Sequence, residues 1–167
     1  MSTDRPLAVV HEVSGVHRLE PLDEVLRERP SLRVIELAGI GPGPFCAMLL
    51  SDMGAEVIRV DRAANVGHDD SRVGGPPGEE YRFNLLARGR KNIAVDLKNP
   101  EGRAVVRRLV LEADVLIESF RPGTLDKLGL GYEQLAAENP RLVFASLSGY
   151  GSDGPYRDRP GQDVLVQ

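Results

Sequence analysis

The sequence lacks the residues from which disulfide frameworks and thiolate metal sites are built. It contains one cysteine among 167 residues, so it cannot form a disulfide within the chain or a metal site with several thiolate ligands. An excess of positive charge is also missing, because 21 Lys and Arg residues stand against 25 Asp and Glu residues for a net charge of -4. The chain as a whole therefore does not attract nucleic acid or an anionic membrane, and a polyanionic ligand would need a local cluster of basic residues.

Long apolar runs are absent as well. No run approaches the roughly 20 residues that cross a bilayer as a helix. The start of the chain, Met1 to Arg5, does not show the basic-then-apolar order of a signal peptide. A cytoplasmic location without a membrane partner is the expectation.

The composition that remains is typical of an ordinary globular protein, with 41% hydrophobic and 28% charged residues. The length suits one α/β domain with a core. Residues 1–31 mix short apolar runs with charges, and only residues 23–28 look helical. We interpret residues 1–31 as an N-terminal leader outside the sheet and residues 32–167 as the domain.

From Leu32 onward, short apolar runs alternate with patterns of helical period. They predict five strands, over residues 33–38, 56–61, 91–96, 114–118 and 142–147. They also predict four helices, over residues 45–53, from residue 99 onward, up to residue 128, and over 132–138. This alternation predicts a Rossmann-like α/β fold with a doubly wound, mostly parallel sheet and ligands at the carboxyl ends of its strands. Residues 62–89, rich in Gly, Asp, Arg and Pro, predict a functional or mobile loop.

A glycine-proline turn, Gly39 to Pro44, joins the first predicted strand to its helix, and Asp61 ends the second strand. This arrangement resembles a nicotinamide-binding fingerprint. The third glycine of that fingerprint, however, falls on Pro44, and Pro42 and Pro44 remove two backbone N–H donors that a pyrophosphate would use. The turn either packs the helix onto the strand or lets a different ligand approach the glycine backbone.

Further blocks occur in a fixed order along the chain: 34–48, 54–62, 88–92, 95–98, 114–123, 128–131, 139–142 and 148–151. Together they resemble the class III CoA-transferases of the CaiB/BaiF family and their relatives, the α-methylacyl-CoA racemases. The resemblance covers about residues 32–167 and implies the CoA-binding part of the family's large domain, incomplete relative to the family. It also implies an interlocked homodimer in the full-length form.

Coenzyme A carries a pyrophosphate and a 3′-phosphate, so an acidic chain must concentrate cations locally to bind it. The resemblance implies that CoA is bound by Ile40, Gly41, Pro42, Arg62, Val95, Leu97, Lys98, Ser119, Phe120 and Arg121. It also implies that the basic segment with Arg88, Arg90 and Lys91 lines the nucleotide site. Phe120 is expected either to pack against the ligand or to anchor its own turn. No metal site is expected.

The end of the chain separates the two branches of the family. The racemases carry an acid/base histidine where this chain has Gln162, and an amide cannot take up and return a proton near neutral pH. The three histidines, His11, His17 and His68, lie elsewhere and are expected at the surface. The implied activity is CoA transfer from an acyl-CoA to a carboxylic acid, with an α-methylacyl-CoA racemase-like enzyme and an inactive CoA-binding remnant as alternatives.

In the transferase branch a carboxylate acts as the nucleophile and forms an aspartyl intermediate. The resemblance implies that this aspartate lies downstream of Asp163, which has at most a supporting role, so no catalytic residue is expected within the 167 residues. Cys46 lies in an apolar helix with no histidine nearby in the sequence. We expect it to be a buried structural thiol.

Overall fold

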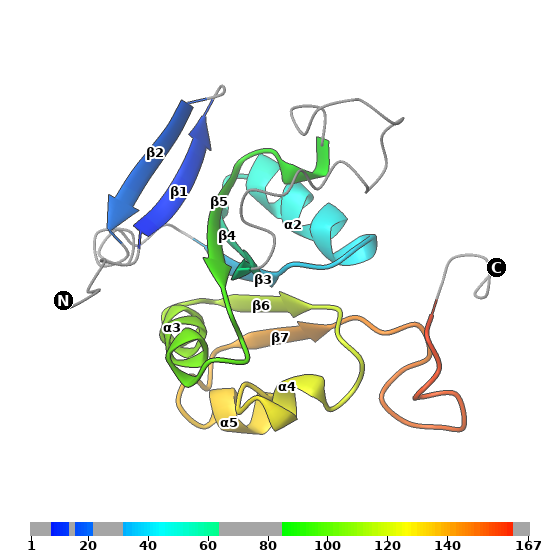
Figure 1. Ribbon diagram of the computed structural model, residues 1–167. Coiled ribbons are helices and arrows are strands. Elements are labelled where there is room, and N and C mark those ends of the chain that lie inside the picture. Colours follow the sequence, from blue (N-terminus) through cyan, green and yellow to red (C-terminus); the bar gives the residue numbers. More distant parts are fainter. Residues whose placement is uncertain (1–7, 14–15, 22–31, 64–84, 162–167) are drawn as a thin grey trace.

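The computed structural model describes residues 8–13, 16–21, 32–63 and 85–161. In these ranges a seven-stranded sheet has the order β2-β1-β5-β4-β3-β6-β7 (Figure 1). The strands are β1 (Ala8–Val13), β2 (Val16–Pro21), β3 (Arg33–Leu37), β4 (Glu56–Arg62), β5 (Arg90–Val95), β6 (Val115–Glu118) and β7 (Val143–Ser146). The helices are α2 (Pro42–Asp52), η3 (Leu85–Ala87), α3 (Pro100–Leu111), α4 (Thr124–Lys127) and α5 (Tyr132–Ala136).

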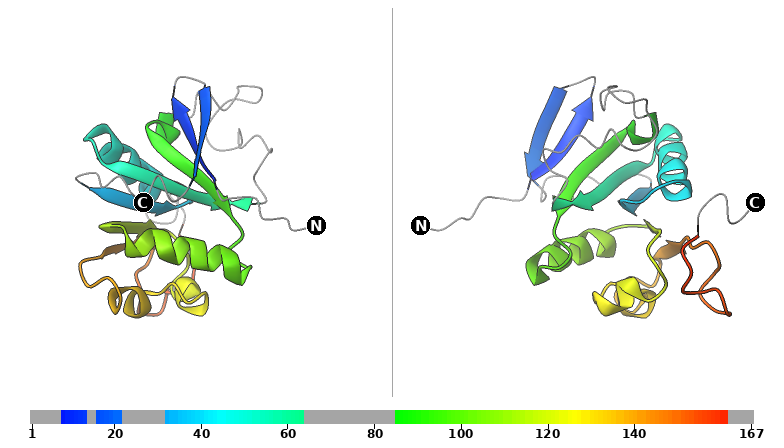
Figure 2. Two further views of the ribbon diagram at one scale, coloured as in Figure 1. Left: turned by 90° about the vertical axis from the view of Figure 1, so that its left-hand side faces the viewer. Right: turned by 45° about the vertical axis from the view of Figure 1, so that its right-hand side comes forward.

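Five of these strands are parallel, from β5 through β4, β3 and β6 to β7. The chain moves outward from β3 to β4 and β5, then returns past β3 to add β6 and β7 on its other side. This order confirms the doubly wound α/β sheet. α2 covers one face of the parallel strands, and α3, α4 and α5 cover the other (Figures 1 and 2).

The core has two parts because successive side chains of a strand point to opposite faces of a sheet. Val34 of β3 faces α2 and packs in a small cluster with Ala47 of that helix. Its neighbour Ile35 faces the opposite side and joins the larger cluster, which includes Leu109 of α3 and Leu135 of α5. All five residues of β3 are buried, as expected for the central strand of a parallel sheet.

Residues 1–31 were expected to lie outside the sheet, and for β1 and β2 that expectation is wrong. β1 pairs antiparallel with β2 along its whole length and antiparallel with β5 at Val10–Asn92 and His11–Lys91. The edge of β5 offers unpaired backbone groups, and the hairpin satisfies them. The segment 23–28 lies outside the described residues, and the division into leader and domain stays a prediction.

The boundaries of two further elements differ from the sequence patterns. α2 begins at Pro42 rather than at residue 45, because the first turn of a helix needs no N–H donors and tolerates both prolines. Its N-cap, Gly41, has a φ of 79°, a conformation that favours glycine. η3 interrupts the predicted loop 62–89, of which residues 64–84 lie outside the described ranges.

α3 begins as its sequence predicts. The side chain of its N-cap, Asn99, accepts a hydrogen bond of 2.9 Å from the backbone N–H of Glu101, and Pro100 occupies the first turn. Leu109 and Val110 are fully buried against the sheet. No helix among the described residues is long and apolar enough to cross a membrane.

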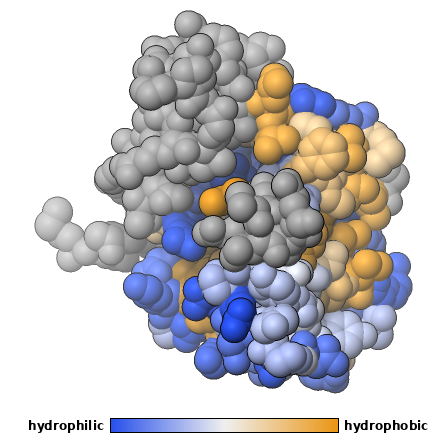
Figure 3. All heavy atoms as spheres, turned by 90° about the vertical axis from the view of Figure 1, so that its right-hand side faces the viewer, coloured by the Kyte–Doolittle hydropathy of each residue, from blue (hydrophilic) through white to orange (hydrophobic). Residues whose placement is uncertain are grey.

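α2 is apolar on its outer face as well. Phe45, Leu49 and Met53 are 50%, 42% and 74% exposed and recur every fourth residue, so they lie along one side of the helix end. Figure 3 shows apolar surface gathered on this side of the molecule. Cys46 is exposed too, which corrects the expectation of a buried thiol. The cause is that α2 buries only Gly43, Pro44, Ala47 and Met48.

Candidate functional site

A hollow of about 750 Å³ opens at the carboxyl ends of β3, β4, β6 and β7. Two of its walls are the segments that leave β3 and β6, the neighbouring strands between which the doubly wound chain reverses direction. Open α/β sheets bind ligands at this switch point. The lining residues are Ala38, Gly39, Ile40, Pro42, Arg62, Ser119, Phe120, Arg121, Pro122, Ser146, Leu147, Ser148, Gly149, Tyr150, Gly151, Arg157, Arg159, Pro160 and Gly161.

The two central walls meet closely at Gly39 and Ser119. A Cβ placed on Gly39 would lie 2.1 Å from the Ser119 hydroxyl and 3.5 Å from its Cβ. A side chain at position 39 would therefore displace Ser119, and the glycine keeps the turn after β3 close to the turn after β6. Ile40 is 72% exposed and Pro42 is exposed, so this turn adds apolar surface to the hollow.

The charge of the hollow differs from that of the chain. Its charged lining residues are Arg62, Arg121, Arg157 and Arg159, and no Asp or Glu is among the lining residues that the structure describes. Arg62, Arg121 and Arg157 form no ion pair with a described residue. Like charges in one concave site raise the local potential, and the hollow therefore suits an anionic ligand.

A buried acid holds two walls of the hollow in place. Glu118, at the end of β6, is only 5% exposed. Its carboxylate accepts a hydrogen bond of 2.7 Å from the backbone N–H of Phe120 and another from the hydroxyl of Ser146 on β7. Phe120 itself is partly buried against the large core while it lines the hollow. Glu118 thus positions the lining residues Phe120 and Ser146 although it does not itself line the hollow.

The outer wall is the loop that follows β7. The rings of Tyr150 and Tyr156 are 5.7 Å apart between centroids, and the guanidinium of Arg159 lies 4.5 Å from the Tyr156 centroid. The ends of the loop meet where Gly149 and Gly161 pass within backbone contact. These contacts give the loop an internal structure of its own.

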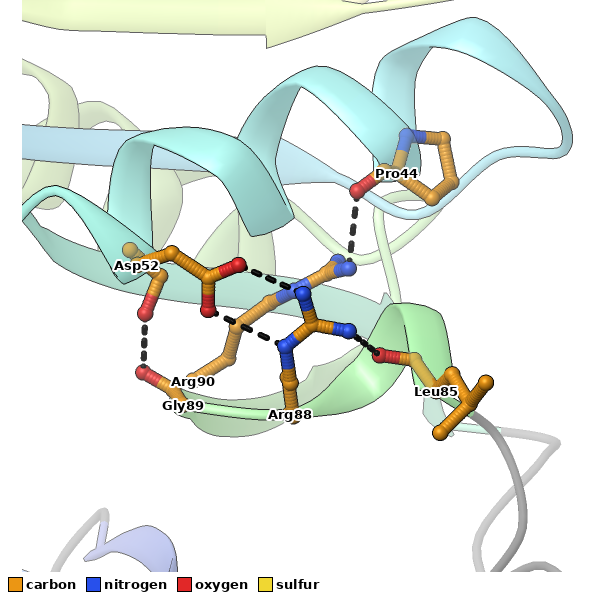
Figure 4. Close-up of polar contacts among 7 residues, drawn as sticks. Pro44, Asp52, Leu85, Arg88, Gly89 and Arg90 are labelled. Carbon is orange, nitrogen blue, oxygen red and sulfur yellow. Dashed lines mark hydrogen bonds and ion pairs between the residues drawn. The ribbon is translucent and has the colours of Figure 1, made fainter.

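A second polar cluster lies outside the hollow, on the face of the sheet that α2 covers. The side chains of Glu36 on β3 and Arg90 on β5 form a fully buried ion pair. Arg90 also donates a hydrogen bond of 2.8 Å to the carbonyl of Pro44, which Figure 4 shows. Burial raises the pKa of Glu36, and the positive charges of Arg90 and Arg59 offset part of that rise. Through these contacts Arg90 connects the first turn of α2 to β3 and β5. The first turn of α2 directly follows the segment after β3 that lines the hollow.

The basic segment of Arg88, Arg90 and Lys91, at the start of β5, does not line the hollow. Arg88 pairs with Asp52 of α2, and these hydrogen bonds lower the pKa of Asp52 (Figure 4). Lys91 pairs with Glu56 of β4. Since Arg90 pairs with Glu36 of β3, all three cations of this segment are engaged in ion pairs, with α2, β3 and β4 respectively.

The structure brings together six of the ten residues expected at a CoA site: Ile40, Pro42, Arg62, Ser119, Phe120 and Arg121. The other four do not line the hollow. Gly41 caps α2 between two lining residues, Val95 is buried in the large core, and Leu97 packs against that core. Lys98 is exposed beyond the carboxyl end of β5. Contact of all ten with a ligand stays a prediction.

The sequence patterns missed the wall formed by residues 146–151, 157 and 159–161. Its signal was present, because a Ser-Gly-Tyr-Gly block follows the last predicted strand, where a doubly wound sheet places its ligand loops. Gln162, Asp163 and His68 lie outside the described residues, and His11 and His17 lie on β1 and β2. No Asp, Glu, Cys or His is among the described lining residues, whose polar side chains are those of Arg, Ser and Tyr.

Comparison with known proteins matches the chain to one family. The family model described as CoA-transferase family III matches residues 31–167. The α-methylacyl-CoA racemase of Homo sapiens is 47% identical over 133 residues, which are 80% of this chain and 31% of the racemase. The succinate–glutarate CoA-transferase of Agrobacterium fabrum is 46% identical over 145 residues, which are 81% of this chain and 36% of the transferase.

Solved structures agree with this match. The crystal structure of a CAIB/BAIF family protein from Brucella suis superimposes with a TM-score of 0.73 at 46% identity, over 82% of this chain and 37% of that protein. The protein Rv3272 from Mycobacterium tuberculosis has a TM-score of 0.65 at 38% identity, over 81% of this chain and 36% of its own. The chain spans about a third of the length of the curated relatives it matches.

Proposed function

The chain belongs to CoA-transferase family III, and from that premise we propose that it supplies the CoA-binding part of an enzyme that moves CoA from an acyl-CoA to a carboxylic acid. One observation carries this proposal: the hollow at the switch point is lined by four arginines and, among the described residues, by no acid. In a chain of net charge -4 this concentration of cations supports a ligand with several phosphates.

In this proposal Arg62 binds the nucleotide of CoA at the β4 end of the hollow. The turn of Ile40 and Pro42 and the ring of Phe120 provide apolar surface for the chain that leads to the thioester. Lys98, exposed at the same edge of the sheet, adds a cation near Arg62. The described residues are thus proposed to bind and orient CoA.

The chemistry is proposed to follow the transferase branch. A carboxylate attacks the acyl-CoA, which releases the CoA thiolate and forms a mixed anhydride. The thiolate then attacks the aspartyl carbonyl, which forms the aspartyl thioester and releases the donor acid. The acceptor acid attacks this thioester to form a second mixed anhydride, and the released thiolate attacks its acyl carbon to give the new acyl-CoA and the free aspartate. We propose that this carboxylate corresponds to an aspartate that the relatives carry downstream of the part aligned with these 167 residues. On this proposal the 167 residues bind CoA but do not transfer it. Since one relative is named for succinate and glutarate, we propose a small dicarboxylic acid as the acceptor.

A racemase is the second candidate, because the human racemase is 47% identical. Gln162 argues against a racemase, since an amide cannot take up and return a proton as a general acid and base near neutral pH. Exchange of the α-proton of a 2-methylacyl-CoA with deuterated water, by a protein extended to the length of its relatives, separates the two. Exchange without CoA transfer would favour the racemase, while loss of both activities would favour an inactive remnant.

Titration calorimetry of the chain with CoA and with NADH tests the binding proposal. CoA is expected to bind more tightly, because its 3′-phosphate adds an anionic group for the arginines of the hollow that NADH lacks. Arg62→Gln should weaken CoA binding about tenfold. Arg141→Gln, the same charge change at an exposed position outside the hollow, is the control and should leave binding unchanged. Tighter binding of NADH than of CoA would contradict the family-based function.

A homodimer is part of the proposal and is supported by the apolar side of α2. Phe45, Leu49 and Met53 form an exposed apolar row that association would cover. Sedimentation equilibrium should show self-association that Leu49→Glu weakens and that Glu133→Gln on α5 does not. Cell fractionation tests the proposed cytoplasmic location.

A further inference from the structure

The four arginines of the hollow do not form one cluster. Arg62 lies at the end of β4, whereas Arg157 and Arg159 belong to the loop after β7. β4 and β7 are separated by β3 and β6, and adjacent strands lie about 4.8 Å apart, so the two ends of the hollow are about 14 Å apart. The hollow therefore presents two separate cationic ends.

Uncharged residues separate Arg62 from the other arginines of the hollow. Gly39, Ile40 and Pro42 line it after β3, and Ser119 and Phe120 line it after β6, ahead of Arg121. A ligand with one anionic group at the β4 end has to cross this uncharged surface before it reaches the β7 end. The cations at the β7 end are thus available to an anionic group other than the one that Arg62 holds.

Arg157 is the cation placed for that role. Its terminal guanidinium nitrogen lies 3.7 Å from the point where a Cβ on Gly123 would stand, so the side chain reaches from the β7 loop to the turn after β6. That turn carries Arg121, two residues before Gly123. Arg121 and Arg157 thus both line the hollow, from the neighbouring segments that follow β6 and β7.

Two other charged groups bear on Arg157. Arg159 is engaged with the ring of Tyr156. Asp126 has one oxygen 3.9 Å from the same point beside Gly123, and among the described residues no ion pair of 4.0 Å or less joins it to Arg157. Two like charges that approach each other in a concave site gain free energy when an anion lies between them.

We propose that Arg157, together with Arg121, binds a carboxylate of the small acid that shares the hollow with CoA. The inference rests on the proposed function, because it takes the β4 end as the place of the CoA phosphates. A guanidinium offers two parallel N–H donors that match a carboxylate, and a planar fork held by a structured loop fixes the direction of that pair. Arg157 is a binding residue for the acid and sets the choice of substrate.

The test uses succinate as the probe, added to the ¹⁵N-labelled chain with and without CoA. The Arg157 side-chain Nε–H resonance should shift as succinate binds, and Arg157→Gln should weaken succinate binding about tenfold, as expected for loss of a charge-assisted hydrogen bond. Arg157→Lys keeps the charge without the fork and should restore only part of the affinity. CoA affinity should stay the same in both variants.

Arg141→Gln is again the matched control, since it changes the net charge equally at an exposed position outside the hollow. Circular dichroism of each variant shows whether the fold is retained. If Arg157→Gln weakens CoA binding as much as succinate binding, or alters neither, the proposal is overturned. If the chain binds succinate through Arg157 but does not bind CoA, the proposed function fails while the carboxylate site stands.

Discussion

Gly149 and Gly161 touch backbone to backbone at the two ends of the β7 loop. A Cβ placed on either glycine would lie 2.6 Å from the Cα of the other, and backbone atoms cannot yield as the tip of a side chain can. The contact brings the lining residues Tyr150, Arg157 and Arg159 back toward the strand that carries them. It is the point at which the outer wall of the hollow is closed.

Replacing Gly161 by alanine should therefore open this loop. The added Cβ needs a backbone shift, and the displaced arginines should lower CoA and succinate affinity by about tenfold at most, a change of about 1.4 kcal/mol. Limited proteolysis should cut the loop faster. Ser152→Ala lies in the same loop but outside the lining and should change neither result. Unchanged proteolysis of the glycine variant would show that the loop is not closed by this contact.

Ser146→Ala should destabilise the chain by about 0.5–1.5 kcal/mol, because it removes one hydrogen-bond donor from the buried carboxylate of Glu118, although Ser146 is exposed and water can reach its place. Denaturation by urea measures the free energy of unfolding. Ser148→Ala removes a nearby exposed hydroxyl of the same wall and should stay within about 0.5 kcal/mol of the wild type. Equal effects of the two variants would mean that Glu118 does not hold β7.

Glu36 predicts a pH dependence of stability. Its pKa is raised above the ordinary value of 4.5 by burial, so between 4.5 and the folded value the folded chain keeps a proton that the unfolded chain has released. This contribution is fully present below 4.5 and is lost as pH rises through the folded pKa. Relative to Glu36→Gln, the wild type should therefore lose stability as pH rises above 4.5 toward the folded pKa of Glu36.

Urea denaturation of both chains across this range measures the difference. Gln is the neutral isostere, so the two chains should be nearly equal in stability at the acid end. If the wild type instead gains stability over Glu36→Gln as pH rises, the charge of Arg90 outweighs burial and the pKa of Glu36 is lowered.

The exposed ion pair between Asp52 of α2 and Arg88 should show the opposite pH dependence. Hydrogen bonds from Arg88 hold the pKa of Asp52 below its ordinary value of 3.8, and an NMR titration should find Arg88→Gln shifting that pKa back toward 3.8. The stabilisation from this pair is present above 3.8 and is lost as pH falls, but water screens it, so thermal stability should barely change. Arg141→Gln is the control. An Asp52 pKa that does not respond to Arg88 would contradict the contact.

The sequence predicted the five parallel strands and most helices because their signals are local. Apolar runs such as residues 33–37 are too short for helices and are bounded by turn residues, and Asn99 and Pro100 mark the start of α3. The alternation of strand and helix then determines the doubly wound topology, since parallel strands need crossover connections. Six of the ten expected site residues meet in one hollow for the same reason.

The tertiary structure alone decided the remainder, because those features depend on what packs against a segment. The hairpin of β1 and β2 belongs to the sheet because the edge of β5 is there to receive it. Cys46 is exposed because α2 has apolar residues on its outer as well as its inner side, and only the sheet selects which side is buried. Arg90 pairs with Glu36, and Arg157 reaches Gly123, across 54 and 34 positions of sequence. No local pattern records a contact between residues so far apart, since chain folding alone brings them together.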